Sequence, residues 1–298
     1  MNKSSVYEII TERMVSLLES GTVPWKKSWA GSQGLPRNAV SGKEYRGINV
    51  FLLACAGYAD NRWVTFKQAV TLKGSVRKGE KGMPVVFWKK FDPKDKESKD
   101  PKDRGGMMLR YYTVFNVSQC DGLALPPPTV DETPGTANER DDHADRVVVD
   151  YVSRATVKGR ALVIHHGQTG AYYDRDVHVV GLPNLEKFFS MQEYYGVLFH
   201  ELTHSTGHHD LLGRFRDETP TQFSRMDYSR EELVAEMGAA FLSAVCRFSE
   251  STIENSAAYI KGWLKALKDD PKAVVIAAAQ AQKAADLILG RKFGVESE

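Results

Sequence analysis

The chain has 298 residues, of which 42% are apolar and 26% are charged, so it is long enough for two domains of ordinary size with buried cores. No run of 18 apolar residues occurs and the first residues lack the apolar stretch of a leader, which predicts neither a transmembrane helix nor a signal peptide. Cys55, Cys120 and Cys246 are scattered, odd in number and without metal-ligand spacing, which predicts a reducing, cytoplasmic setting.

The net charge of +2 conceals two halves of opposite sign. Residues 1–123 contain 21 Lys and Arg against 12 Asp and Glu, a net charge of +9, whereas residues 124–298 contain 19 against 26, a net charge of −7. The Pro-rich, polar stretch 125–140 predicts a linker between them. We therefore expect an α+β protein with a basic mixed α/β domain over residues 1–124 and a second domain over residues 141–298.

In the basic half the apolar patterns predict helices over residues 3–20, 47–58 and 66–72, and strands near 85–91 and 109–117 around a charged loop at 92–106. Four of the five tryptophans lie here among Lys and Arg residues. Basic side chains follow a nucleic-acid backbone and exposed aromatic rings stack on unpaired bases, so this composition favours single-stranded DNA. Most aromatic residues of such a domain belong to its core, and a basic domain without any DNA partner is the alternative. The candidate DNA-binding residues are Trp25, Lys26, Lys27, Trp29, Tyr45, Arg46, Arg77, Lys78 and Lys81, with Trp25, Trp29 and Tyr45 as the stacking rings.

In the acidic half the patterns predict a helix over residues 139–155, strands near 160–166 and 171–180, and helices over 185–208, 229–248, 252–268 and 271–289. The segment from Ala171 to Val180 has the alternation of a hairpin or an edge strand. An edge strand beside a metal site can pair with an extended peptide through main-chain hydrogen bonds.

The segment His200-Glu201-Leu202-Thr203-His204 has the HExxH pattern of zinc hydrolases. On a helix, His200 and His204 project from one face one turn apart, so both rings can reach one metal ion. Glu201 then lies where its carboxylate can act as the base for an attacking water. Against this stands a solvated helix face that carries two histidines by chance, but the apolar residues upstream predict a helix with a buried face.

A catalytic zinc ion usually takes a third protein ligand, and the sequence offers several. Glu232 lies four residues before Glu236 on a predicted amphipathic helix, so Glu232 is our candidate ligand and Glu236 the outer acceptor for a ligand histidine. Asp210, in the pattern HExxHxxGxxD, is the alternative, and Glu231 is a further one. His208 follows the helix and is a candidate for the surroundings of the metal.

The motifs of both halves, taken in order, carry a family resemblance. They are the segments 24–29 (PWKKSW), 45–49 (YRGIN), 63–69 (WVTFKQA), 76–82 (VRKGEKG), 194–208 and 231–242. Together they resemble the ArdC family of antirestriction proteins of conjugative plasmids and the related N-terminal part of TraC-type plasmid primases. The resemblance implies an N-terminal domain that binds single-stranded DNA and a C-terminal zincin-like metallopeptidase domain.

What the resemblance implies for function is protection of incoming plasmid DNA from host restriction. The expected cofactor is Zn²⁺, with Mn²⁺ as another candidate, and the expected partners are single-stranded DNA and a protein substrate such as a part of the host restriction machinery, with no membrane. The alternative is a DNA-coating protector whose metal site is structural or catalytically idle. A nuclease is disfavoured, because many nucleases use two metal ions held by hard oxygen ligands.

Overall fold

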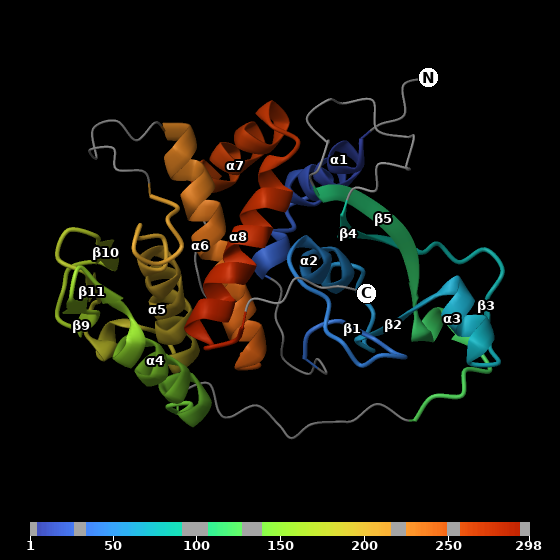
Figure 1. Cartoon of the computed structure of the whole chain (residues 1–298), viewed down its shortest axis with the longest axis horizontal. Coiled ribbons are helices and arrows are strands. Elements are labelled where there is room, and N and C mark those ends of the chain that lie inside the picture. The colour runs from blue at the N-terminus through green and yellow to red at the C-terminus, as the bar shows by residue number, and fades with distance from the viewer. Residues whose placement is uncertain are drawn as a thin grey trace.

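The structure, a computed structural model, describes residues 5–26, 34–90, 107–126, 139–215, 225–248 and 257–292. Within these ranges the helices are α1 (Val6–Glu19), α2 (Ile48–Ala54), α3 (Phe66–Thr71), α4 (Asp142–Arg154), α5 (Met191–Ser205), α6 (Arg225–Val245), α7 (Ala257–Asp269) and α8 (Ala273–Ile288). The strands are β1 (Arg37–Asn38), β2 (Arg62–Thr65), β3 (Ser75–Val76), β4 (Met83–Lys90), β5 (Met107–Asn116), β6 (Cys120–Asp121), β7 (Thr156–Val157), β8 (Arg160–Ala161), β9 (Val163–His165), β10 (Tyr172–Asp174) and β11 (Val179–Gly181). Helices and small sheets are built from separate segments, which confirms the predicted α+β class (Figure 1).

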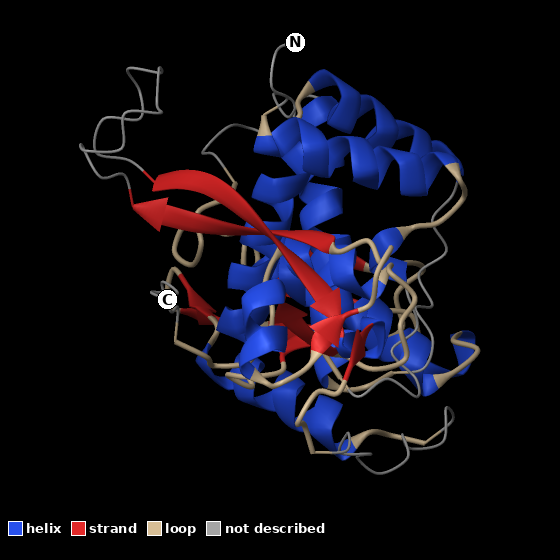
Figure 2. Ribbon diagram, turned by 90° about the vertical axis from the view of Figure 1, so that its right-hand side faces the viewer, coloured by secondary structure: helices blue, strands red, loops and turns tan. Residues whose placement is uncertain are grey.

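A four-stranded sheet of order β1-β2-β5-β4 dominates the N-terminal half. β4 pairs antiparallel with β5 over its whole length, and the two strands form the long twisted ribbon of Figure 2. The run from Val85 to Trp88 combines β-branched and aromatic side chains, which favour a strand. At the free edge of β4, the side chain of Asn49 exchanges two 2.7 Å hydrogen bonds with the main chain of Val86. Part of the outer edge of this strand is thereby closed to another strand.

The main hydrophobic core joins the N-terminal helices to the C-terminal ones. Helix α8 packs on α5 and α6, α1 packs on α7 and α8, and α2 packs on α8. Phe51 of α2 stacks on Phe241 of α6 with ring centroids 4.8 Å apart, and Trp25 meets Trp263 of α7 edge to face at 5.1 Å. The two halves of the chain therefore bury apolar surface against each other, and the domain boundaries at residues 124 and 141 stay a prediction.

Polar contacts cross the same interface just before α2. Arg46 forms an ion pair with Asp286 of α8, whose side chain is almost completely buried. The amide of Gly47 donates to Gln282 at 3.0 Å, and the amide of Gln282 donates to Asp286 at 3.3 Å. Gly47 has a φ of +57°, a conformation that side chains with a Cβ rarely adopt, so glycine allows the chain to turn into α2 here. These bonds fix the start of α2 on the C-terminal helices.

The C-terminal half contains a three-stranded sheet of order β10-β11-β9, in which β10 is an edge strand as predicted. The segment predicted as one strand at 160–166 forms two short strands, β8 and β9, because the chain first turns back to pair β8 with β7. Helix α6 spans Arg225–Val245 within the described residues, so it already includes residues before the predicted start at 229. The predicted loop at 92–106 and most of the predicted linker lie outside the described residues. Of the helices in the described part of the chain, none has the length and apolar character that crossing a membrane requires.

Candidate metal centre

Helix α5 carries the HExxH segment and is fixed at its start by a cap. The Ser190 hydroxyl accepts a hydrogen bond from the amide of Glu193 at 3.1 Å, which satisfies one of the free donors of the first turn. Tyr195, Leu198, Phe199 and Leu202 are buried along one side of the helix. This apolar side holds the helix against the core, so the opposite side presents His200 and His204 one turn apart toward α6.

A close crossing of α5 and α6 brings the third residue to the histidines. A Cβ atom built at Gly238 of α6 would lie 2.5 Å from Cγ2 of Thr203 on α5, a distance that carbon atoms do not reach. Thr203 itself is fixed because its hydroxyl donates to the Phe199 carbonyl at 2.7 Å. A side chain at position 238 would therefore push the helices apart and move Glu232 away from the histidines.

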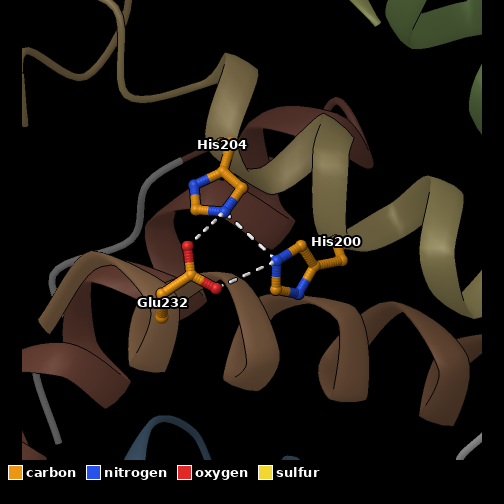
Figure 3. Close-up of side chains that lie close together, drawn as sticks. All are labelled: His200, His204 and Glu232. Carbon is orange, nitrogen blue, oxygen red and sulfur yellow. Dashed lines mark hydrogen bonds and ion pairs between the residues drawn. The ribbon is translucent and has the colours of Figure 1, made fainter. Parts of the chain in front are cut away.

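His200, His204 and Glu232 converge on one point (Figure 3). The Nε2 atoms of the two histidines lie 3.1 Å apart. The Glu232 carboxylate faces both rings, with Oε2 3.6 Å from Nε2 of His200 and Oε1 3.5 Å from Nε2 of His204. The three donor groups therefore lie within reach of a single cation.

This donor set fits a divalent transition metal. Two imidazoles and one carboxylate are a common ligand set of catalytic zinc, and they leave a coordination position open. The buried Nδ1 of His200 makes no hydrogen bond to any described residue, and Oε1 of Glu236 lies 3.8 Å from it. An imidazole that binds a cation through Nε2 keeps its proton on Nδ1, where a carboxylate is the usual partner. Glu236 thus lies where its predicted outer role requires, at a distance longer than a hydrogen bond.

The pKa values of the site show which charges its ligands carry. Burial alone would raise the pKa of Glu232, but the facing imidazole rings of His200 and His204 hold it far below its usual value. Burial alone would lower the pKa of His204, but Glu231 and Glu232 raise it to about 10. Without a metal ion, His204 therefore carries a proton that balances the ionised Glu232, and a divalent cation supplies the same balance with more charge.

Glu201 follows the ligand His200 in the chain, and its side chain is buried. Burial raises the pKa of its carboxyl group above the ordinary value, although the two histidines lower it in part. The main chain of Tyr173 on β10 also lowers this pKa in part. A raised pKa suits a group that accepts and then releases a proton near neutral pH.

The remaining candidates do not face the point where His200, His204 and Glu232 converge. Asp210 accepts the amide of Lys158 at 2.8 Å and pairs with His209 at 2.7 Å, so it does not face the two histidines of α5. His208 is buried, and its Nδ1 accepts the amide of Asp210 at 3.2 Å. Glu231 contacts the outer nitrogen Nδ1 of His204 at 3.3 Å and is paired with Arg214. Arg214 was not predicted, because nothing in the sequence connects a residue after the helix with one on α6.

The predicted DNA-binding residues have mixed positions. Trp25 is 1% exposed and Tyr45 is 9% exposed, so in this structure neither presents a ring face to a base, and the prediction that they stack is wrong. Both rings fill cores that the Gly- and Pro-containing sequence around them did not reveal. Arg46 is engaged with Asp286. Lys27 and Trp29, and the side chain of Lys26, lie outside the described residues.

The rest of the predicted DNA-binding group lies at the surface. Lys78 and Lys81 are exposed, whereas Arg77 pairs with Glu80 at 2.9 Å and with Asp121 at 3.3 Å. The exposed rings that our prediction missed include Trp88, at 41%, and Tyr111, at 51%. They point to the same face of the β4–β5 ribbon, since Trp88 lies opposite Leu109 and Tyr111 opposite Val86. Both residues lie on predicted strands next to Lys89 and Arg110 in the sequence, and this pattern could have identified them as candidates for DNA binding.

Comparisons with known proteins agree with this architecture. The model of the N-terminal domain of the anti-restriction factor ArdC matches residues 4–115, and a zincin-like metallopeptidase model matches residues 153–280. The DNA primase TraC of Escherichia coli is 34% identical over 96% of this chain, which spans 20% of the length of that primase. The protein y4eC of Sinorhizobium fredii is 32% identical over 95% of this chain and 91% of its own length.

A solved structure extends the similarity to three dimensions. The crystal structure of the antirestriction ArdC protein from the R388 plasmid, in its Mn(II)-bound form, superposes with a TM-score of 0.76 at 34% identity. The alignment covers 96% of this chain and 98% of that one. The chain therefore belongs to the ArdC family of antirestriction proteins and combines an ArdC-type N-terminal domain with a zincin-like metallopeptidase domain.

Proposed function

We propose that this protein binds single-stranded DNA without strong sequence specificity and hydrolyses a protein bound near it, so that plasmid DNA entering a cell by conjugation escapes restriction. The observation that carries the peptidase part is the convergence of His200, His204 and Glu232 beside the buried base Glu201. Zn²⁺ is the cofactor that the ligand set favours, and Mn²⁺ is the alternative, since a related ArdC structure holds it.

The residues of the chain have separate tasks in this hydrolysis. When bound by His200, His204 and Glu232, a divalent cation would supply Lewis-acid polarisation of the scissile carbonyl group and of the attacking water. Glu201 accepts a proton from that water and later delivers it to the departing amine nitrogen. The edge strand β10 packs on α5, the helix that carries Glu201, which suits a substrate chain that pairs with this strand in an extended conformation.

The DNA-binding part rests on the basic N-terminal half. Its net charge of +9 over residues 1–123 favours phosphate binding through counterion release. Lys78 and Lys81 extend into solvent, and Trp88 and Tyr111 offer exposed rings on one face of the β4–β5 ribbon. Such rings stack on unpaired bases, which favours single strands over duplex.

A second candidate function is a DNA-coating protector whose metal centre takes no part in protection. It is favoured by the layout of the molecule, in which β3 and α3, next to the Lys78–Lys81 loop, lie at the opposite end of the long axis from the β9–β11 sheet (Figure 1). Coating a strand from that end requires no contact with the metal centre.

The change Glu201→Gln separates the two functions. It keeps the size of the side chain and the ligands His200 and His204, and removes only the base. Cleavage of fluorescently labelled casein by the metal-loaded protein should fall by about 10²–10⁴-fold. Transfer of unmodified plasmid DNA into a restricting recipient should fall with it, while the exposed-site control Glu186→Gln keeps both. If protection survives Glu201→Gln unchanged, the DNA-coating function is the correct one.

A further inference from the structure

The two histidines of the metal centre are held very differently on their outer sides. Nδ1 of His204 faces Oε1 of Glu231 at 3.3 Å, whereas Nδ1 of His200 has no hydrogen-bond partner among the described residues. A hydrogen bond at the second nitrogen of a metal-binding imidazole fixes its tautomer and its ring orientation. His204 is therefore the histidine whose ring orientation the protein already fixes.

Glu231 is in turn held by Arg214, whose side chain is almost fully buried. The guanidinium group donates to both carboxylate oxygens, from Nε to Oε2 at 3.0 Å and from Nη2 to Oε1 at 2.8 Å. Its remaining donors reach the end of α5, at the Thr203 carbonyl at 2.7 Å and the Thr206 hydroxyl at 2.8 Å. A fork of this kind fixes position as well as charge, because two parallel bonds prevent rotation of the carboxylate.

The chain makes room for this arginine at Gly207. A Cβ atom there would lie 3.0 Å from Nη2 of Arg214 and 2.8 Å from the ring of Phe215. The φ of Gly207 is not in the left-handed region, so close approach, and not a turn, accounts for glycine at this position. The glycine of the HExxHxxG pattern thus lets the segment after α5 fold back until Arg214 reaches α6.

We infer that Glu231 and Arg214 are positioning residues for the metal ligand His204, an inference that rests on the proposed metal centre. Glu231 accepts the Nδ1 proton of His204 and keeps Nε2 pointed at Glu232 and His200. Arg214 locks Glu231 in place and ties it to the last turn of α5, so that the two helices and their ligands keep one relative position. Arg214 also neutralises Glu231, which leaves the charge of Glu232 for the cation.

The competing explanation is a buried ion pair that only holds α5 against α6. Such a pair affects the free energy of unfolding but leaves the affinity of the folded protein for a metal ion unchanged. The two explanations therefore differ in metal binding, which can be measured without any enzymatic assay.

The test uses the full chain and the variants Glu231→Ala, Glu231→Gln and Arg214→Lys. Arg230→Ala serves as control, because Arg230 lies on the same helix and pairs with Asp270 at 3.1 Å. Dissociation constants for Zn²⁺ and Mn²⁺ are measured by chelator competition, the visible absorption of bound Co²⁺ reports the ligand geometry, and urea unfolding of the metal-free protein reports stability.

We expect Glu231→Ala to bind Zn²⁺ and Mn²⁺ about 10–100-fold more weakly and to change the Co²⁺ spectrum, as removal of an outer partner of a ligand histidine does. Arg214→Lys should show a smaller loss of affinity, because lysine cannot form the pair of parallel hydrogen bonds to Glu231. Glu231→Gln should also lose less affinity than Glu231→Ala, because the amide oxygen still accepts a hydrogen bond from His204. Wild-type affinity and spectrum in Glu231→Ala, or in folded Arg214→Lys if Glu231→Ala does not fold, would overturn the inference. A wild-type protein that binds none of the three ions would instead overturn the proposed function itself.

Discussion

The metal centre and the basic surface of the N-terminal half are built on opposite principles. At the metal centre, charged and imidazole groups are buried between two helices, and His204, Glu231 and Arg214 are held by named partners. On the basic surface, Lys78, Lys81 and the rings of Trp88 and Tyr111 extend into solvent. Metal binding therefore depends on the exact position of a few atoms, whereas DNA binding is the sum of many small contributions from separate side chains.

This difference sets how each region responds to change. A buried ligand that is removed leaves other buried groups without their partner, so one substitution has a large effect. An exposed lysine or aromatic ring leaves no such gap, so its loss lowers DNA affinity by a modest amount and leaves folding intact. Substitutions in the two regions should therefore separate metal binding, stability and DNA affinity.

The largest expected effect is on stability, for the change Trp25→Ala. Trp25 belongs to the DNA-binding candidates by sequence but packs edge to face on Trp263 in the main core. Replacing a buried tryptophan by alanine costs about 3–5 kcal/mol of the free energy of unfolding. Trp88→Ala is the matched change, since it removes the same ring from an exposed position. It should lower the free energy of unfolding in urea clearly less than Trp25→Ala does, and lower the affinity for a single-stranded oligonucleotide by about 1–3 kcal/mol. Equal losses of stability in the two variants would contradict the assignment of Trp25 to the core and of Trp88 to the DNA-binding surface.

The next effect concerns metal binding, for the change His200→Ala. Binding of a structural zinc ion is worth about 10–16 kcal/mol, so one of several ligands accounts for about 3–4 kcal/mol, or about 10²–10³-fold in affinity. Chelator competition with Zn²⁺ measures this loss, and His165→Ala, an exposed histidine of β9, is the control. Affinity for single-stranded DNA should stay at the wild-type value. A parallel loss of DNA affinity would show that the two regions are coupled.

The same contrast explains what could be predicted from the sequence. The spacing of His200 and His204 is a geometric constraint, because a helix places residues four apart on one face wherever it lies. Glu232 could be named for the same reason, through its spacing from Glu236. Most long helices and the β4–β5 strands follow from their apolar patterns. Trp25 and Tyr45 could not be assigned, because whether an aromatic ring is stacked in a core or exposed depends on segments distant in the chain, such as α7 and β4. Arg214 depends on the same kind of contact, since its reach to Glu231 is set by the path of the chain after α5.

A smaller effect is expected for Arg46, which sequence analysis assigned to DNA and the structure pairs with Asp286. Breaking a buried ion pair costs about 3–5 kcal/mol, and because a third of the Arg46 side chain is exposed we expect about 1–3 kcal/mol for Arg46→Ala. Urea unfolding measures the loss. Arg77→Ala, whose partners are at the surface, should unfold like the wild type. If Arg46→Ala keeps full stability but loses DNA affinity, the original assignment to DNA is right after all.

The smallest effect is expected for the exposed lysines, and it is best measured as a salt dependence. Each phosphate contact on single-stranded DNA contributes about 0.7 to the slope of log affinity against log salt concentration. If Lys78 and Lys81 each neutralise one phosphate, the double change Lys78→Ala and Lys81→Ala should reduce the slope by about 1.4. The control is the double change Lys261→Ala and Lys265→Ala, two exposed lysines of α7. Unfolding in urea should be the same for both double variants and the wild type. A contact surface in the N-terminal half would leave the slope of this control at its wild-type value. An equal reduction of the slope in the control would instead mean that the net charge of the whole protein governs DNA binding.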